Sequence, residues 1–542
     1  MIFMLEGFTR KMVIALACLA FLVGAVPAVA GDIYIAQIAQ GVNDGQDCAD
    51  AYAVSFFNNP ANWGTAAGKI GPGTTVKLCG VFTFAAGSNG LMVQGSGANG
   101  NPVTILFESG AILQAPYFLG FPGGGIVIDT FNYITVDGGT NGIIQNTANG
   151  TNLANRQTSS GMFVRNTTGV EIKNLTIRNI YVHVGSQPTD SDSNGQLTSD
   201  IELEGNQTNL NIHNNKLTAA RMGINSDFGG TTVNGLTISN NTISDHCFMM
   251  SLGFGSATTA AGVSVHDNDM SNWDNWQFPG NTFHQDGIIT HIAGNNPNTY
   301  APNIYNNYFH TNLGNGNATA FLFLANDTSG QPVHFQANVF NNVFMSDLHK
   351  TNTSSVGVGI NAIWIQGTTG PHFIYNNTFS APLASTAAIV NADGGAVTLT
   401  LKNNIFIGYA NAMACYNLCQ NDVPVADYNL YFRMALSGGQ IIANNIGAGT
   451  GPWYSFTQWQ AKGYDTHGVT ADPALDTTGY PQVGSAAAGA ATNLTSLGIA
   501  ALDADKAGLP RPPTGTWDIG AYQYAAADSR PAPPTGLTVT VH

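Results

Sequence analysis

A short pattern of apolar and polar residues recurs along the chain. In Leu236–Ile243 (LTISNNTI), apolar and polar positions alternate, two asparagines follow, and an apolar residue resumes. The alternation predicts a short strand. The asparagine pair predicts a sharp turn, because asparagine tolerates the left-handed backbone conformation. Variants of the pattern recur at spacings of 26 to 39 residues and end at Leu217, Ile243, Met270, Phe309, Phe340, Phe379 and Phe406.

Repeats of this kind predict a β-solenoid, in which each coil buries its apolar face against the coils above and below it. Asparagine side chains stacked from coil to coil are expected to hydrogen-bond along the stack. The uneven spacing predicts that loops of different length leave one corner of a common coil. Such loops are where binding and catalytic residues are expected.

The first thirty residues have the features of a secretory signal peptide. Arg10 and Lys11 precede an apolar run, Met12–Val26, and Ala28–Ala30 forms a small-residue cleavage site. We therefore predict a secreted protein, extracellular or on the cell surface, with a retained N-terminal anchor as the alternative. The apolar run is short for a membrane span, and no later segment is apolar enough to cross a bilayer, so no membrane insertion is expected.

Two segments are predicted to cover the ends of the solenoid. Asp47–Trp63 has helical apolar spacing and is predicted to be an amphipathic cap, while Trp453–Gly463 is predicted to form a short helix at the other end. The predicted domains are the signal peptide (1–30), the cap and first coils (31–100), the main parallel β-helix (101–420), the last coils and closing segment (421–524), and a Pro-rich linker with the start of a further module (525–542).

Composition limits the choice of partners. Charged residues make up only 9% of the 542 residues, and the formal net charge is −15. An acidic surface repels nucleic acid and anionic lipid, so neither is an expected partner. A polyanionic substrate stays possible, because local basic residues or a bound cation would offset the charge. We expect a monomer.

Export permits disulfides, and one of the six cysteines lies in the signal peptide. An odd number then remains, so a monomer keeps at least one free thiol. We predict the pairs Cys48–Cys79 and Cys415–Cys419. Cys247 lies in a strand-like run and is predicted to be a buried thiol, with a catalytic cysteine as the alternative.

The repeats, the export signal and the cap together resemble the pectate-lyase-like superfamily over Ile33–Tyr524. The sequence GLPRPP followed by DIGAYQY is similar to the C-terminal end of many secreted bacterial β-helix proteins. The resemblance implies an all-β fold, a right-handed parallel β-helix with an N-terminal amphipathic helical cap and a C-terminal closing segment. It leaves the activity open, because this scaffold carries lyases, hydrolases, esterases, epimerases and adhesins.

One segment, Leu236–Gly253, is similar to the strand and asparagine turn of pectate lyases and their following D-H-D-K-V-M-L-L-G sequence. Asp245 and His246 match, but Phe248 occupies the position of the lyase lysine. His284–Ile292, where a lyase carries its catalytic arginines, contains none. The polygalacturonase motifs N-T-D and G-H-G are also absent. Classical pectate lyase and polygalacturonase activities are therefore both disfavoured.

A candidate site emerges when the coils are aligned on their asparagine turns. This alignment places Arg221-Met222, Asp245-His246 and Gln285-Asp286 at equivalent positions, and adjacent strands lie about 4.8 Å apart. The predicted catalytic residues, clustered at one corner, are Asp286, Asp245, His284, His246 and Arg221. Two carboxylates about 5 Å apart would serve a retaining glycosidase, and a wider pair an inverting one. A basic group with an acid-neutralising group would serve a β-eliminating lyase. The alternative is that these side chains cap turns by bonding to backbone amides.

Aromatic residues gather in the insertion Ser271–Gln285, beside the predicted cluster. Exposed aromatic faces stack on sugar rings, whose axial C–H groups are apolar; the alternative is that these rings pack the insertion onto the coil. Two further candidates lie at the far ends of the same strands. The predicted substrate-binding residues are Trp273, Trp276, Phe278, His291 and Asp227.

The polar segment Pro188–Asp200 only loosely resembles a calcium loop, since it lacks the regular spacing and terminal glutamate of an EF-hand. We predict a solvated loop there, name no certain cofactor and leave calcium binding open. The expected function is a secreted carbohydrate-active protein, a hydrolase or lyase of extracellular polysaccharide. The alternative is a non-catalytic cell-surface adhesin or glycan-binding solenoid.

Overall fold

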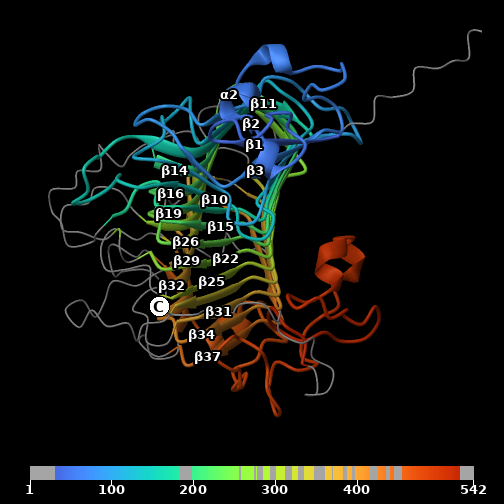
Figure 1. Ribbon diagram of the computed structural model, residues 1–542. Helices are drawn as coiled ribbons and strands as arrows, with labels where there is room; N and C mark the ends of the chain where they lie inside the picture. The colour runs from blue at the N-terminus through green and yellow to red at the C-terminus, as the bar shows by residue number, and fades with distance from the viewer. Residues whose placement is uncertain are drawn as a thin grey trace, which may run out of the picture.

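The chain winds into a stack of parallel strands, coil upon coil (Figure 1). The structure, a computed structural model, describes residues 31–183, 198–255, 258–273, 276, 285–292, 301–311, 320–326, 335–346, 361–368, 370–381, 387–392, 397–415, 425–434, 440–444 and 454–524. The described strands form a sheet of 27 strands and a sheet of 12. The larger sheet contains two ladders joined by the long strand β14, so each coil contributes strands to three ladders. The predicted parallel β-helix is confirmed.

The first ladder carries the candidate site. It runs through β5 (Leu91–Met92), β8 (Ile126–Asp129), β11 (Ser159–Thr168), β14 (Thr198–His213), β16 (Met222–Asp227), β19 (Phe248–Phe254), β23 (Asp286–Ile292), β26 (Ala320–Asn326), β29 (Asn361–Gln366), β32 (Ala387–Asn391), β35 (Asn411–Cys415) and β38 (Gln440–Asn444).

The second ladder includes the distal half of β14. Its other strands are β1 (Asp32–Ala36), β3 (Thr75–Cys79), β6 (Val103–Phe107), β9 (Ile134–Asp137), β12 (Glu171–Lys173), β17 (Thr232–Ser239), β21 (Ser264–His266), β24 (Asn303–Tyr305), β27 (Ala337–Phe340), β30 (His372–Tyr375), β33 (Leu399–Lys402) and β36 (Val425–Asp427), with β2 (Tyr52–Ala53) and β20 (Thr259–Ala261) paired at its margins.

The third ladder is the 12-stranded sheet. It consists of β4 (Val81–Thr83), β7 (Ile112–Ala115), β10 (Ile143–Asn146), β13 (Thr176–Arg178), β15 (Lys216–Thr218), β18 (Thr242–Ser244), β22 (Asp269–Ser271), β25 (Tyr308–Thr311), β28 (Val343–Ser346), β31 (Thr378–Ser380), β34 (Ile405–Ile407) and β37 (Leu430–Phe432).

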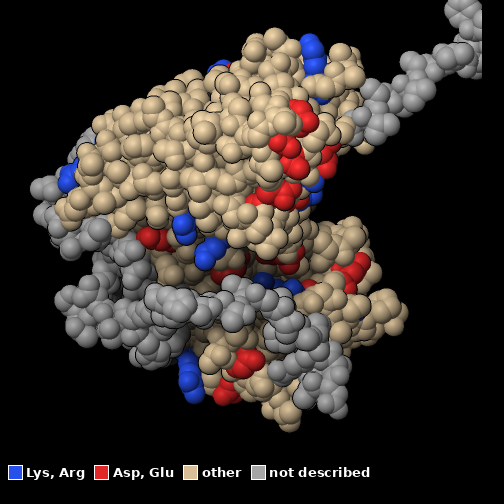
Figure 2. All heavy atoms as spheres, in the orientation of Figure 1, with Lys and Arg blue, Asp and Glu red and all other residues tan. Residues whose placement is uncertain are grey.

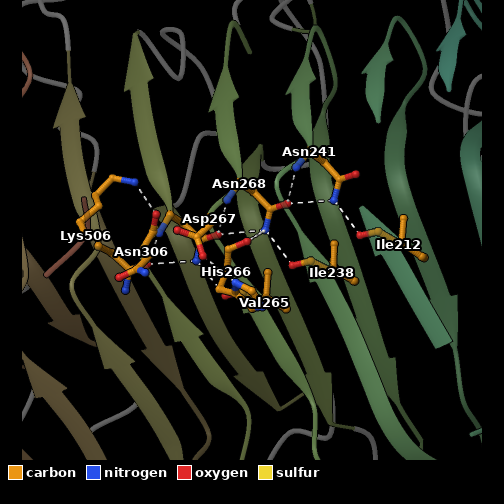
Figure 3. Close-up of polar contacts among 11 residues, drawn as sticks. Ile212, Ile238, Asn241, Val265, His266, Asp267, Asn268, Asn306 and Lys506 are labelled. Atoms are coloured by element: carbon orange, nitrogen blue, oxygen red, sulfur yellow. Dashed lines mark hydrogen bonds and ion pairs between the residues drawn. The ribbon is translucent and has the colours of Figure 1, made fainter. Parts of the chain in front are cut away.

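Asparagine pairs turn the chain from the second ladder to the third. The first asparagine of a pair adopts a positive φ, as at Asn240 (54°) and Asn306 (55°). The second is buried, and both its backbone N–H and its side-chain amide donate to Oδ1 of the equivalent asparagine in the next coil, as from Asn241 to Asn268 (3.1 and 3.0 Å) (Figure 3). The predicted bonding along the stack is confirmed for Asn215, Asn241, Asn268, Asn307, Asn342, Asn377, Asn404 and Asn429.

Apolar side chains fill the interior. On the third ladder, Phe309, Phe344, Phe379 and Phe406 stack face to face at 4.8 to 5.0 Å between ring centroids. Phe340, which the sequence pattern placed in this series, lies before its asparagine turn in β27, and Phe344 takes the equivalent position after that turn. That prediction was wrong because the repeat was read to the wrong side of the turn.

The N-terminal segment differs from the predicted continuous helix. Within Asp47–Trp63 the structure has only a short helix, α2 (Val54–Phe57), with 3-10 turns at Cys48–Asp50 and Pro60–Asn62. Tyr52–Ala53 pairs with β1, which interrupts the helical spacing. The Cys48–Cys79 disulfide is confirmed, and α2 lies at the end of the stack in Figure 1. A capping function for this segment stays a prediction.

At the other end, the predicted short helix is present as α5 (Phe456–Ala461), preceded by β39 (Tyr454–Ser455). Trp459 of α5 is fully buried and donates to Asp465, whose carboxylate also accepts the last bond of the asparagine stack, from Asn429. The chain then runs along the outside of the coils, where Leu494 and Trp517 pack on outward-facing side chains such as Tyr375. A closing function stays a prediction.

Cys247 is a buried thiol, as predicted. Cys415 is disulfide-bonded, and its predicted partner Cys419 lies outside the described residues. The predicted signal peptide and the C-terminal linker, 525–542, lie outside them too. No helix in the described part of the chain is long and apolar enough to span a membrane. Charged side chains are sparse on the face shown in Figure 2; acidic ones form a patch in its upper right, and further charges of both signs are scattered below it.

Candidate functional site

The outward face of the first ladder concentrates charged side chains. Ile201 and Leu203 of β14 point into the core, so the alternate residues Glu202 and Glu204 point outward. Strand register then sets these glutamates beside side chains of neighbouring coils. One row is Asp129, Arg165, Glu204, Asp227, Gly253 and His291; the adjacent row is Val127, Phe163, Glu202, Asn225, Ser251 and Ile289.

We call the five charged residues of this face the acidic floor: Asp129, Arg165, Glu202, Glu204 and Asp227. Arg165 donates two hydrogen bonds to the Asp129 carboxylate, with Nε–Oδ1 and Nη2–Oδ2 distances of 2.9 and 2.6 Å. Its Nη1 lies 4.0 Å from Glu204. The hydrogen bond with Asp129 raises the pKa of Arg165. The floor therefore holds one cation against four carboxyl groups.

Glu202 is the most enclosed acid of the floor, with 7% of its surface exposed. Its carboxylate accepts hydrogen bonds from Ser199 Oγ (2.6 Å) and Asn225 Nδ2 (2.8 Å). Burial raises the pKa of Glu202 to about 7, although those two hydrogen bonds act in the opposite direction. At neutral pH this side chain is therefore present in both the protonated and the ionised form.

Asp227, predicted as a secondary candidate, lies on β16 opposite Glu204 and diagonally from Glu202, and it is exposed. Its charge contributes to raising the pKa values of Glu202 and Glu204, after the larger effect of their burial. His291, the other secondary candidate, lies two strands further along the same row. Gly253 between them contributes no side chain. The floor thus places a protonatable acid beside an exposed carboxylate.

The described residues of the predicted corner cluster lie at or just before the starts of neighbouring strands, but in a different register. Met222 pairs with Phe248, and Phe248 with Asp286, so Arg221 is level with Cys247 rather than with Asp245. The predicted alignment was displaced by two residues. The spacing from the asparagine turn to the strand is the same in these two coils, so the turn aligns Arg221 with Cys247. The backbone N–H groups of Cys247 and Phe248 both donate to the Arg221 carbonyl.

Asp286, the first predicted catalytic residue, is fully buried. Its Oδ1 accepts a hydrogen bond from the backbone N–H of Ala320 on the next strand (3.1 Å). Arg221 is buried as well, while Asp245 is half-buried with a positive φ of 65°. Asp286 therefore accepts from a backbone amide, as the alternative for this cluster expected, and its burial removes it from the solvent-facing surface.

His246 pairs with a residue that the sequence placed in a solvated loop. Asp200 lies in β14 instead, two residues after the strand begins, and both side chains are fully buried with 2.8 Å between Nε2 and Oδ2. Burial raises the pKa of Asp200 and lowers the pKa of His246 to about 3. The pair holds one proton, and its burial makes it a structural element of the coil.

The predicted tryptophan platforms are buried. Trp273 lies in the core against Phe321, with Nε1 donating to the Asp286 carbonyl. Trp276 stacks on His183 at 4.5 Å and donates to the Asp245 carbonyl. Both rings therefore pack the chain onto the coil, as the alternative reading had it. Two other predicted site residues, His284 and Phe278, lie outside the described residues.

Sequence reasoning missed Glu202 and Glu204, although a signal was present. The chain has only five glutamates, and two of them occupy alternate positions in Ile201–Glu204. Alternation with apolar residues in a strand predicts that both point to one outer face. Among the residues that the structure describes, no group of three or more His, Cys, Asp or Glu side chains is arranged to hold a metal ion.

Comparisons with known proteins leave the family open. No protein-family model matches the chain, and no curated protein matches it. Its similarities are to solved structures at low identity. A pectate lyase, Pel9A, is 12% identical, covering 91% of this chain and 96% of that one, with a TM-score of 0.45. XylC in complex with xylose is 10% identical, with 91% and 98% covered and a TM-score of 0.40. The family 28 exopolygalacturonase of Yersinia enterocolitica is 11% identical, with 74% and 80% covered and a TM-score of 0.32.

Proposed function

We propose that the protein is a secreted glycoside hydrolase whose acidic floor binds an extracellular polysaccharide. The observation that carries the proposal is the presence on one face of Glu202, whose pKa lies near 7, and of the exposed carboxylate of Asp227 on the next strand. Two carboxyl groups in contrasting environments are what glycoside hydrolysis requires.

The two acids take different roles in this mechanism. Protonated Glu202 donates its proton to the oxygen of the scissile glycosidic bond, and Ser199 and Asn225 hold its carboxyl group in place. Asp227 accepts a proton from the water that attacks the sugar carbon. The leaving sugar thus gains a proton from Glu202, and the water gives one to Asp227.

The spacing of the strands favours inversion of configuration. Asn225 is opposite Glu202, and Asp227 is two residues further along β16. From strand spacing and rise, the Cα atoms of Glu202 and Asp227 are about 8 Å apart. Inverting glycosidases keep their carboxyl groups about 6.5–9.5 Å apart, which leaves room for the water.

Hydrolysis is favoured over β-elimination by the same charges. A lyase needs a base together with groups that neutralise a substrate carboxylate. The one arginine of the floor is already bonded to Asp129. The five residues are therefore suited to protonating a leaving group rather than to stabilising a carbanion.

The test is product formation from a panel of polysaccharides, scored both for new reducing ends and for the absorbance of unsaturated products. We expect reducing ends only. Glu202→Gln and Asp227→Asn are each expected to lower the rate by about 100- to 10 000-fold, the usual contribution of a general acid or base.

Glu108→Gln is the matched control, because Glu108 follows β6 on the second ladder, away from the floor. Its rate is expected to equal that of the unmodified protein. Unchanged rates in both floor variants, with folding intact, would remove Glu202 and Asp227 from the chemistry. Retention of a polysaccharide with no product from any substrate would support the adhesin alternative instead.

A further inference from the structure

The arrangement of charges on the acidic floor determines whether a charged or an uncharged glycan can bind there. Arg165 directs Nε and Nη2 to Asp129 and has Glu204 near Nη1, so its donors already face carboxylates. Bidentate pairing of this kind is the strong form of an ion pair. A substrate carboxylate would have to replace Asp129 in order to reach the guanidinium.

The remaining charges of the floor are all acidic. Glu202, Glu204 and Asp227 lie within two adjacent strands, β14 and β16. An anionic sugar laid across these strands would meet like charges at close range, and like-charge juxtaposition at an interface costs several kcal/mol. A neutral sugar meets no such repulsion, and its hydroxyl groups can donate to the same carboxylates.

An exposed aromatic ring lies beside the arginine end of the floor. Phe121 is 45% exposed and meets buried Phe163 edge-on, at 5.7 Å between ring centroids. Phe163 is also the ring over which the Arg165 guanidinium lies, at 5.4 Å. Met92, 37% exposed, lies two strands away from Phe163 in the same row. An apolar surface next to hydrogen-bonding groups suits a pyranose, which has an apolar face and polar edges.

Resting on the proposed function, we infer that the floor takes an uncharged polysaccharide and that the Asp129–Arg165 pair excludes polyuronates. Asp129 is a specificity-determining residue in this account. It keeps Arg165 from binding a uronate carboxylate and adds its own negative charge to the floor. A sugar ring lies against Phe121, and the following sugars cross β11, β14 and β16 toward Asp227.

Affinity electrophoresis of the mature chain tests this inference, with neutral polysaccharides or polygalacturonate and alginate cast in the gel, each with calcium or with a chelator. The unmodified protein is expected to be retarded by a neutral polysaccharide and not by either polyuronate, with or without calcium. Asp129→Asn is expected to shift the ratio of polyuronate to neutral affinity upward by about tenfold, because Arg165 gains a free donor edge.

Asp32→Asn is the matched control. Asp32 pairs with Lys77 at 2.8 Å on the second ladder, so the substitution changes net charge equally but outside the floor. It is expected to leave the ratio unchanged; an equal shift in this variant would overturn the role of Asp129. Retardation of the unmodified protein by polyuronates as strong as by neutral glycans would overturn the inference and leave the proposed hydrolase standing. No retardation by any polysaccharide, together with no product, would overturn both.

Discussion

The two neighbouring asparagines of one turn have different structural roles. Asn306 supplies the left-handed backbone conformation, and its carbonyl accepts from Lys506 of the C-terminal segment. Asn307 is buried and carries the stack, donating to Val265 O and to Asn342 Oδ1 while accepting from Asn268. The sequence predicted both properties of asparagine, the turn and the stack, but not which member of the pair has which task.

Replacing the two asparagines separately tests this division. Asn307→Ala removes the Oδ1 that accepts from the buried backbone N–H of Asn268 and the amide that donates to the Val265 carbonyl, so the free energy of unfolding is expected to fall by about 2–4 kcal/mol. Asn306→Gly keeps the positive φ and is expected to change it by less than about 1 kcal/mol. Urea unfolding of both variants provides the measurement, and equal losses would contradict the assignment.

Glu202 is expected to lower stability at high pH as the cost of its function. Its folded-state pKa of about 7 is above the ordinary 4.5, so its contribution is favourable at low pH and is lost as pH rises through 7. Glu202→Gln is therefore expected to raise the free energy of unfolding at pH 8 by about 1–3 kcal/mol. At pH 4 the gain is expected to vanish. Urea titrations at the two pH values measure this change in the free energy of unfolding. An effect of Glu202→Gln that does not depend on pH would contradict the raised pKa.

The Asp200–His246 pair predicts a different pH dependence. The folded pair holds one proton, and so does the unfolded pair between about pH 4 and 6.5, where aspartate is ionised and histidine protonated. Above that range the unfolded chain loses its proton, whereas the raised pKa of Asp200 favours keeping the proton on the folded pair, so stability falls. Asp200→Asn is consequently expected to be less destabilising at pH 8 than at pH 5, as measured by chemical unfolding. The reverse order would contradict a proton shared in the core.

At the scale of elements, the sequence predicted the strands that repeat from coil to coil, but it did not predict the places where a coil departs from the repeat. Alternation and asparagine turns are local signals, so the strands and the parallel stack followed from them. The helix predicted over Asp47–Trp63 is interrupted because Tyr52–Ala53 pairs with β1, a contact absent from local spacing. Asp200 was assigned to a loop because its polar neighbours hid the start of β14. The floor residues Glu202 and Asp227 required the register of separate coils, which depends on the whole stack.

The C-terminal segment is an element that the coil holds through polar contacts. Arg511 is buried and donates to Asn341 Oδ1 (2.9 Å) and Gln523 Oε1 (2.7 Å). Asn403 exchanges hydrogen bonds with Thr492. These bonds tie the segment to the outer side of the asparagine turns.

Arg511→Gln is expected to loosen this segment without unfolding the coil. Proteolytic cleavage and amide exchange within residues 487–522 are expected to increase, because buried carbonyl groups lose their donor. Arg433→Gln, at an exposed position, is the control and is expected to behave like the unmodified protein. Global unfolding of Arg511→Gln at the same conditions would contradict a locally attached segment.

At the scale of the whole molecule, the coils stack with their strands in register. This stacking brings residues that are distant in the sequence together on one face. Asp129, Glu202 and Asp227 belong to three different coils, and the parallel first ladder aligns them on one face. In the proposed binding mode, a glycan would lie along the solenoid and cross one strand after another, from Phe121 toward Asp227. The predicted corner cluster belongs to the same coils, but burial assigns Asp286 and His246 to the support of this face rather than to its surface.

The most direct test of this account is the pH dependence of kcat/KM on a neutral polysaccharide. If Glu202 is the general acid, kcat/KM falls tenfold per pH unit above a midpoint near pH 7, and Glu202→Gln removes that limb together with most of the activity. A profile that stays flat from pH 6 to pH 9, or a limb that survives in Glu202→Gln, would contradict the account.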